Sequence, residues 1–151
     1  MKKVPDSYCD LVTSHACVVN GDPYVVPINY KFENDFIYCH SLPGMKIDGL
    51  RKHPRACLQV DEIRNELYWK SVLAFGNYEE VVDQKERDAI YADLLKELPM
   101  LTPVESAIAE DAPEIIVFRI RVDRITGVAE GSASDEFLLL EDAADGSYTA
   151  G

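Results

Sequence analysis

YCHSLPGMKIDGLRKHPR, residues 38–55, is the stretch around which the chain is organised. The Pro-Gly pair at 43–44 interrupts the alternating apolar run that leads into it. Lys46 and Ile47 stand four and three residues before Leu50, which is the spacing of one helical face. The stretch therefore predicts a corner at which a strand ends and a short helix begins.

The corner carries a concentrated positive charge inside an acidic chain. Four basic residues oppose the single acid Asp48, which gives a local net charge of about +3 against −12 for the whole chain. These basic residues are Lys46, Arg51, Lys52 and Arg55. A helix start also presents unbonded N–H groups, so an anion can bind here. A solvated basic helix face explains the same residues, and composition alone leaves both interpretations open.

Length and composition describe one domain over residues 1–151, with residues 130–151 expected as an acidic, loosely ordered tail. With 47% hydrophobic and 28% charged residues, the chain has no window near the roughly 20 apolar residues that span a bilayer. No apolar leader follows Met1-Lys2-Lys3, so a cytoplasmic protein is expected. The sequence pI near 4.6 argues against nucleic-acid and anionic-membrane binding and still allows a small anionic ligand.

The four cysteines carry no metal-binding spacing. Cys9, Cys17, Cys39 and Cys57 form no C-x-x-C pair and match no histidine spacing, so no metal site is expected. The last three lie in apolar, strand-like runs, which predicts buried, reduced thiols.

Strands dominate both sides of the corner. A hairpin is predicted from residues 15–19 and 24–32, joined by the turn Asn20-Gly21-Asp22-Pro23. Pro27 cannot donate to a ladder and indicates an edge or a gap in the barrel at that point. Phe36 to His40 then supplies a third strand, and the three are expected to form a meander.

The second half of the chain predicts three more strands. They cover residues 55–63, 67–82 and 114–125, and Gly76 inside the second indicates a bulge or sharp bend. Alternation in the third is expected to turn Ile116, Phe118, Ile120 and Val122 inward and Val117, Arg119, Arg121 and Asp123 outward.

One longer helix is predicted between these strands. Asp83 has the place of an N-cap with Glu86 three residues on, and the helix runs from Gln84 to Leu98 before Pro99. Residues 102–105 have the pattern of another cap. Six or so strands with two helices and no β-α-β rhythm indicate a mainly β protein, an antiparallel six-stranded barrel.

The order of motifs resembles the flavin-binding split barrels that are similar to pyridoxamine phosphate oxidase, and within them the nitroimidazole-reductase (Nim) group. The resemblance covers most of the chain and rests on a combination of short motifs. These are Asn20-Gly21, YVVPINY at 24–30, IYCHS at 37–41, GMKID at 44–48, LRKHPR at 50–55 and WKSV at 69–72 with the bend at Gly76.

This resemblance implies a Greek-key-like split barrel and a homodimer that binds FMN, with FAD as the alternative, in two grooves between subunits. The residues expected along the isoalloxazine ring are Pro27, Ile28, Asn29 and Tyr30. His40 and Ser41 are expected near the phosphate and ribityl chain, Lys46 on the phosphate with Arg51 as a second basic candidate, and Ser71 and Val72 at the flavin from the long strand. Trp69 is expected at the subunit interface.

Two classes of function follow from the resemblance. The first is a flavin-dependent reductase of small planar oxidants such as nitroimidazoles, with His40 as the candidate catalytic proton donor. The second is a split barrel that binds flavin or haem without turnover. Pyridoxamine phosphate oxidation is less favoured because the C-terminal segment is acidic. Edge-strand roles for Pro27 and Asn29, and a structural role for His40, stay open.

Overall fold

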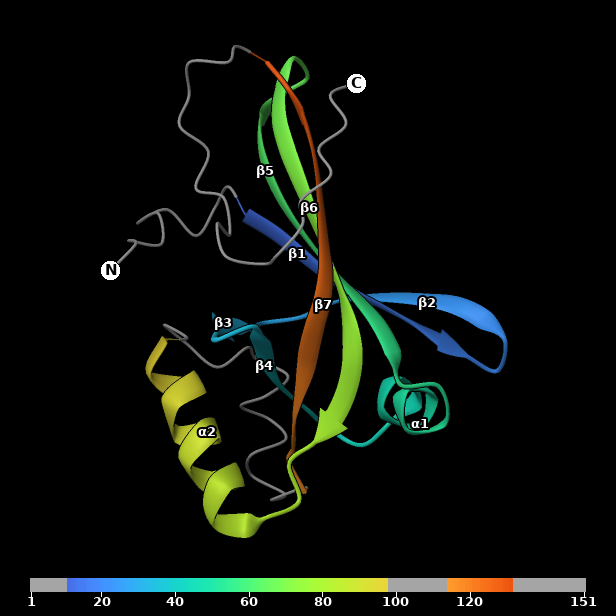
Figure 1. Cartoon of the computed structure of the whole chain (residues 1–151), viewed down its shortest axis with the longest axis vertical. Coiled ribbons are helices and arrows are strands. Elements are labelled where there is room, and N and C mark those ends of the chain that lie inside the picture. Colours follow the sequence, from blue (N-terminus) through green and yellow to red (C-terminus); the bar gives the residue numbers. More distant parts are fainter. Residues whose placement is uncertain (1–10, 98–113, 132–151) are drawn as a thin grey trace.

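A curled antiparallel sheet of seven strands with two helices on its outside makes up the described part of the chain (Figure 1). The computed structural model describes residues 11–97 and 114–131. The elements are β1 (Leu11–Val19), β2 (Asp22–Pro27), β3 (Lys31–Glu33), β4 (Phe36–Ser41), α1 (Met45–Lys52), β5 (Arg55–Asn65), β6 (Tyr68–Glu80), α2 (Gln84–Glu97) and β7 (Ile116–Glu130). The strand order is β2-β1-β5-β6-β7-β4-β3, so β2 and β3 are the two edges of an unclosed sheet. The predicted split barrel with one short and one longer helix is confirmed.

The N-terminal half differs from the prediction in two respects. Strand β1 begins at Leu11, four residues before the predicted start at residue 15. Residues 24–32 were expected to form one strand of a three-strand meander, but β2 ends at Pro27 and β3 begins at Lys31. β2 pairs with β1 and β3 pairs with β4, at opposite edges of the sheet. The reason is that proline supplies no N–H for a ladder, so the chain leaves one edge there and crosses to the other. The sheet therefore has seven strands instead of six.

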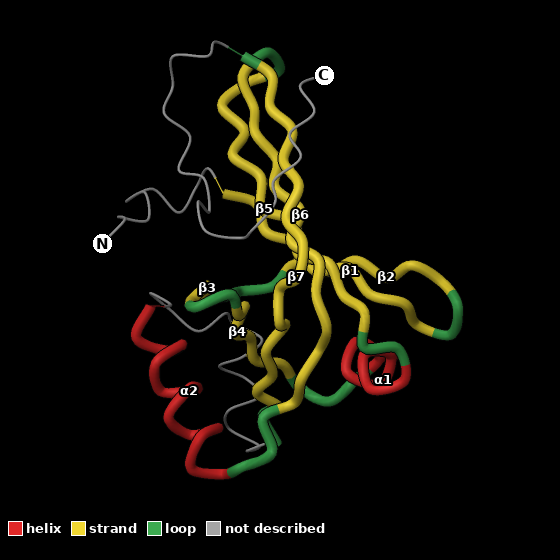
Figure 2. Tube along the Cα trace, in the orientation of Figure 1, coloured by secondary structure: helices red, strands yellow, loops and turns green. Residues whose placement is uncertain are grey.

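Strands β5, β6 and β7 are the long elements, and Figure 2 shows them continuing beyond the barrel as a three-stranded arm. The predicted irregularity at Gly76 is present as a register shift between Phe75 and Gly76. A Cβ at Gly76 would lie 2.3 Å from the carbonyl oxygen of Arg121. Glycine is therefore required where β6 bends closely over β7. The last strand runs five residues further than the predicted end at Ile125.

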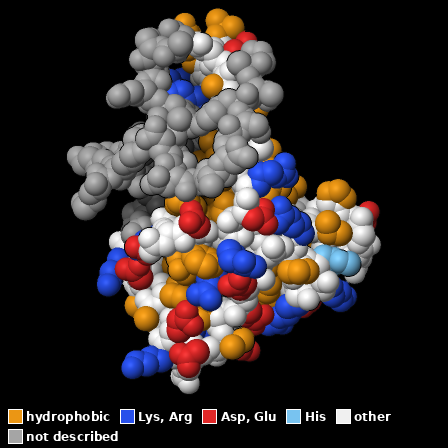
Figure 3. Space-filling view, in the orientation of Figure 1, with side chains coloured by type: hydrophobic (Ala, Val, Ile, Leu, Met, Phe, Trp, Pro, Cys, Tyr) orange, Lys and Arg blue, Asp and Glu red, His pale blue; other side chains and the backbone are white. Residues whose placement is uncertain are grey.

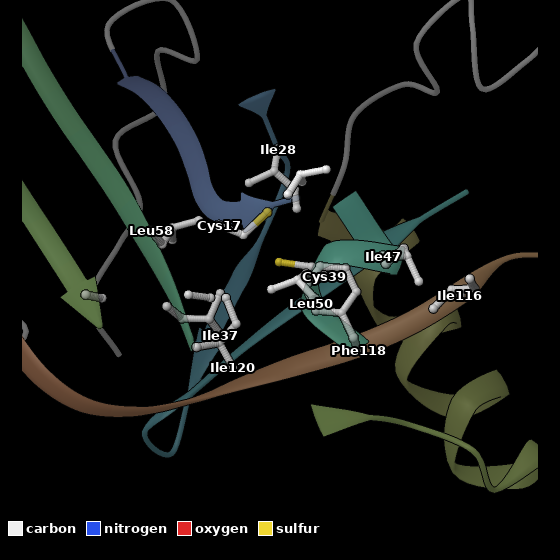
Figure 4. Packing of buried hydrophobic residues seen from close by; sticks show 13 residues of the cluster. Cys17, Ile28, Ile37, Cys39, Ile47, Leu50, Leu58, Ile116, Phe118 and Ile120 are labelled. Atoms are coloured by element: carbon white, nitrogen blue, oxygen red, sulfur yellow. The ribbon is translucent and has the colours of Figure 1, made fainter. Parts of the chain in front are cut away.

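The barrel interior is filled by side chains from β1, β4, β5, β7 and α1 (Figure 4). Its fully buried members include Ile37, Leu58, Phe118 and Ile120. Cys17 and Cys39 are also in this core, buried and free, as predicted, whereas Cys57 is only half-buried. Cys9 lies outside the described residues.

Helix α1 packs on β1. Ile47 and Leu50 are fully buried, and a Cβ at Gly49 would lie 2.7 Å from the carbonyl oxygen of Val18. The helix can therefore approach β1 only because residue 49 has no side chain. Its predicted position after the Pro-Gly pair is confirmed.

Helix α2 covers the outer face of β4 and β7, and its predicted N-cap is confirmed because Asp83 Oδ1 accepts a hydrogen bond from the Glu86 N–H at 2.8 Å. Val117 was expected to face outward, yet only 1% of its surface is exposed.

Three predictions lie outside the described residues. They are the helix end at Leu98, the cap at 102–105 and most of the tail from residue 130. None of the described helices is long and apolar enough to cross a membrane.

Candidate functional site

Lys46 stands in the first turn of α1 as a half-buried cation. Within residues 11–97 and 114–131, the Lys46 ammonium group forms no ion pair with a carboxylate and donates no hydrogen bond. Burial lowers the pKa of Lys46. A lysine that is partly desolvated without a partner costs free energy, which an anionic ligand would offset.

The groups nearest to Lys46 are neutral. Its charge acts on His15, Cys17 and Cys39, all of which are buried in the barrel. Burial raises the pKa of the Cys39 thiol to about 12, although the charge of Lys46 acts against this shift. Burial, aided by Lys46, lowers the pKa of His15 to about 4, so its imidazole is uncharged at neutral pH. None of these groups can neutralise the ammonium.

Surface cations elsewhere are mostly paired. Arg119 binds Glu79 at 3.0 Å and Glu86 at 3.1 Å, and Arg121 also binds Glu79 at 3.0 Å. Figure 3 shows Lys or Arg side chains lying next to Asp or Glu side chains across this face of the molecule. Lys46 differs from these cations because it is half-buried and has no partner among the described residues.

The start of α1 is open. The N-cap Gly44 makes no side-chain cap, and a Cβ there would meet nothing within 4 Å. The first intrahelical bond runs from the Asp48 N–H to the Gly44 carbonyl oxygen at 3.0 Å. The N–H groups of residues 45–47 therefore have no partner within the helix. Amides of this kind next to a lysine suit a phosphate.

Ser41, at the end of β4, lies on the side of the strand that faces the barrel. Ile37 and Cys39 are in the barrel core, and alternation places Ser41 on their face. Its hydroxyl donates to the Leu42 carbonyl oxygen at 2.9 Å. Ser41 and Lys46 are thus the two predicted phosphate-side residues that the structure brings to one corner.

His40 lies on the other side of β4. Its ring is half-buried and meets the ring of Tyr91 from α2, with centroids 5.5 Å apart at 70°. Its cross-strand neighbour Val117 is buried beneath the same helix. The structure therefore separates the catalytic candidate from Lys46 by the strand itself. Its role stays a prediction.

Arg51 is held within the chain. Its Nε and Nη2 donate to the two carboxylate oxygens of Glu80 at 2.8 and 2.7 Å, and Tyr78 donates its hydroxyl to Glu80 at 2.7 Å. The predicted contact between Arg51 and a flavin is untested, but the guanidinium already has a bidentate partner on β6.

The segment expected along the flavin ring follows β2. Pro27 is exposed and Asn29 and Tyr30 are half-buried, while Ile28 is only 9% exposed and belongs to the core. The Ile28 N–H donates to the Thr13 carbonyl oxygen at 3.4 Å, so this backbone donor is engaged within the chain.

Ser71 and Val72 lie on β6, where alternation sends them to opposite faces. Ser71 accepts a hydrogen bond from the Gln59 amide at 3.3 Å, and the same amide donates to both carboxylate oxygens of Asp61. In the strand order, β1 and β5 stand between β2 and β6. Within one chain, the two groups of predicted ring contacts are therefore apart.

Several residues around this corner were not singled out from sequence. Glu80 and Tyr78 bind Arg51, and His15 lies buried near Lys46. The alternation of His15 with Cys17 and Val19 could have placed the histidine inside the barrel. No local pattern connects Arg51 with Glu80, 29 residues further along the chain.

The fold and the α1 corner define a split β-barrel protein with a lysine at a helix start that has no partner among the described residues. The chain belongs to the pyridoxamine 5'-phosphate oxidase family, whose family model matches residues 10–129. The resemblance recognised in the motifs is thereby confirmed at the level of the family. Within the described residues, no group of three side chains could hold a metal ion.

Other proteins are similar to this chain in sequence or in fold. An uncharacterized protein of Rhizobium meliloti is 36% identical over 123 residues, covering 76% of this chain and 81% of that protein. A FAD-binding protein of Mesorhizobium loti has a solved structure that is 32% identical with a TM-score of 0.62, covering 82% of this chain and 88% of that one. A proposed 5-nitroimidazole antibiotic resistance protein of Bacteroides thetaiotaomicron shares the fold at 23% identity and a TM-score of 0.59, covering 77% of this chain and 75% of that one.

Proposed function

We propose that the protein binds FMN between two copies of the chain and passes electrons from it to small planar oxidants such as nitroaromatics. The observation that carries the proposal is Lys46, a half-buried cation with no partner in the described residues, at an open helix start. A flavin is the proposed ligand at this corner because the similar Mesorhizobium loti protein is named as FAD-binding.

The residues present fit the phosphate end of a flavin. An ammonium group and the N–H groups of residues 45–47 supply donors of the kind that bind phosphate. A charge-assisted hydrogen bond of this type contributes about 1.5–3 kcal/mol. FMN ends in a single phosphate, which matches one lysine and one helix start. FAD also carries phosphate groups and is the alternative to be compared with it.

A second copy would complete the ring site. Pro27 to Tyr30 and Ser71 with Val72 are separated in one chain by β1 and β5, so a groove between copies is the arrangement that brings them together. Several apolar side chains on the strands are exposed, among them Val25 of β2 at 62% and Ile63 of β5 at 51%. Exposed apolar surface of this kind favours association. Trp69, whose Nε1 donates to Glu130 within the chain, is also proposed to lie at this interface.

A bound flavin would supply the redox chemistry, and the chain would bind and orient it. Lys46 and the α1 amides would hold the phosphate, and the segment after β2 would lie along the ring. His40 is the proposed proton donor for reduction of the oxidant, since histidine changes charge near neutrality. This division explains why no nucleophile or metal centre is needed for the activity.

The purified protein tests the proposal directly. Flavin absorbance, release of the chromophore on denaturation and titration of the stripped protein with FMN, FAD and riboflavin would identify the ligand. Nicotinamide donors and a nitroaromatic under nitrogen would then test turnover. Bound flavin without turnover would indicate a carrier, oxidation of pyridoxamine phosphate would indicate an oxidase, and failure to bind any flavin would refute the proposal.

A further inference from the structure

We propose that the ion pair of Arg51 with Glu80, supported by the hydrogen bond from Tyr78 to Glu80, fixes the orientation of α1. We call this group of three side chains the strut, and in it Arg51 and Glu80 are positioning residues for Lys46. Arg51 is then no ligand of the phosphate. The inference rests on the proposed function in one point, which is that the phosphate of the ligand binds at α1.

The contacts of the strut are complete without a ligand. Two guanidinium nitrogens of Arg51 donate to the two oxygens of Glu80 at 2.8 and 2.7 Å, and the Tyr78 hydroxyl donates to the same carboxylate at 2.7 Å. The side chain of Glu80 is 26% exposed and that of Arg51 is 48% exposed. A bidentate arginine pair has a defined orientation, which a single lysine contact would not give.

The two basic residues of α1 point in different directions. Lys46 and Arg51 are five positions apart, which on a helix of 3.6 residues per turn is a rotation of about 140°. Arg51 reaches β6, whereas the charge of Lys46 acts on Cys17 and Cys39 in the barrel. One phosphate that contacts Lys46 at the helix start is therefore poorly placed for Arg51 in the last turn.

The remaining contacts show why a side-chain strut matters. On one flank, Gly49 packs against the backbone of Val18. After the helix, the Pro54 carbonyl oxygen accepts a hydrogen bond from the Tyr78 N–H at 2.7 Å. The Arg51–Glu80 pair is the ion pair between α1 and β6 among the described residues. Together with the buried side chains of Ile47 and Leu50, it fixes the rotation of the helix about its axis and hence the direction of Lys46.

A rival role for Arg51 predicts the opposite result. If Arg51 leaves Glu80 to bind the phosphate, replacing Glu80 by glutamine frees the guanidinium and should keep or raise the affinity for phosphate. If Arg51 is a strut, the same change loosens α1 and lowers that affinity. The variant Glu80→Gln therefore separates the two roles by the sign of its effect.

The first measurement compares FMN with riboflavin, which lacks the phosphate. Glu80→Gln is expected to weaken FMN binding about three- to tenfold, in the lower part of the range of coupling between contacting residues, and to leave riboflavin binding within about twofold. Asp123→Asn is the matched control, because it breaks the bidentate Arg55–Asp123 pair without touching α1. Equal losses for FMN and riboflavin, or unchanged or tighter FMN binding, would overturn the proposal.

The second measurement needs no flavin. Reductive methylation of the ligand-free protein, followed by peptide mass spectrometry, reports how accessible the Lys46 amine is. Glu80→Gln should raise its rate about threefold or more, in line with the same coupling, and Asp123→Asn should not. Identical rates in wild type and Glu80→Gln would refute the strut even if flavin binds. Wild-type protein that binds no flavin would instead refute the proposed function, and the labelling would still decide the strut.

Discussion

Acid should destabilise this protein through one buried histidine. His15 is fully buried, and among the described residues neither of its ring nitrogens has a hydrogen-bond partner. Burial and the charge of Lys46 hold its pKa at about 4, below the ordinary value of 6.5. The unfolded chain therefore binds a proton between these two values that the folded chain does not. Stability is full above about pH 6.5 and falls as the pH approaches 4.

The size of the effect follows from the shift. One pKa unit corresponds to about 1.4 kcal/mol, so the full penalty is about 3 kcal/mol, of which about 2 kcal/mol is reached at pH 5. His15→Leu removes the titrating group and its two unpartnered nitrogens. Its stability at pH 7.5 should equal or exceed that of wild type by about 1 kcal/mol, since no hydrogen bond to a described residue is lost.

Urea unfolding followed by the fluorescence of Trp69, the single tryptophan, measures both quantities between pH 7.5 and 5. Protein concentration must be constant, because association changes apparent stability. His53→Gln, at an exposed position, is the control that should keep the wild-type slope. Parallel pH profiles for wild type and His15→Leu would refute the reasoning. So would a loss of several kcal/mol in His15→Leu at pH 7.5, which would show that His15 is hydrogen-bonded.

Three further outcomes are expected. Lys46→Ala should raise the dissociation constant for FMN about ten- to a hundredfold, while Lys52→Ala changes it little, since Lys46 is half-buried without a partner among the described residues and Lys52 is exposed. Equal effects in equilibrium titration would show that the basic face of α1 is only solvated. His40→Gln should keep flavin and lower the nitroreductase rate per bound flavin by about 10²-fold, and an unchanged rate in that assay would withdraw the catalytic role. Gly49→Ala should lower the free energy of unfolding in urea by about 1–3 kcal/mol, because its Cβ meets the β1 backbone. Gly44→Ala, whose Cβ meets nothing, should lower it by less than about 1 kcal/mol, and similar losses for both variants would contradict the packing of α1.

Local signals in the sequence predicted the elements well. The bend at Gly76 and the N-cap at Asp83 were found because glycine and aspartate act on the backbone within a few residues. An edge or gap at Pro27 was predicted, but the crossing to the other edge of the sheet was missed, because the alternation of apolar residues continues from Tyr24 to Phe32. Periodicity reports which face a residue takes and not which edge of the sheet its strand joins.

Long-range features of the site could not be predicted in the same way. The burial of Val117 results from α2, which returns over a sheet face that the strand pattern alone assigns to solvent. The pairing of Arg51 with Glu80 joins two segments that the sequence describes separately. The family resemblance named Lys46 and Arg51 together, but it could not show that only the first of them lacks a partner in the described residues.

The alternation along β4 limits what His40 can do. Cys39 faces the barrel near Lys46, so His40, the next residue, faces Tyr91 on α2. A ligand held by Lys46 and a proton donated by His40 must therefore meet around the end of β4 or across a boundary between two copies. Because the Tyr91 ring contacts the His40 ring, a packing role predicts that replacing the histidine destabilises α2. A catalytic role is thus assigned only if His40→Gln loses turnover while the protein unfolds at the wild-type urea concentration, and loss of both would make His40 a packing residue.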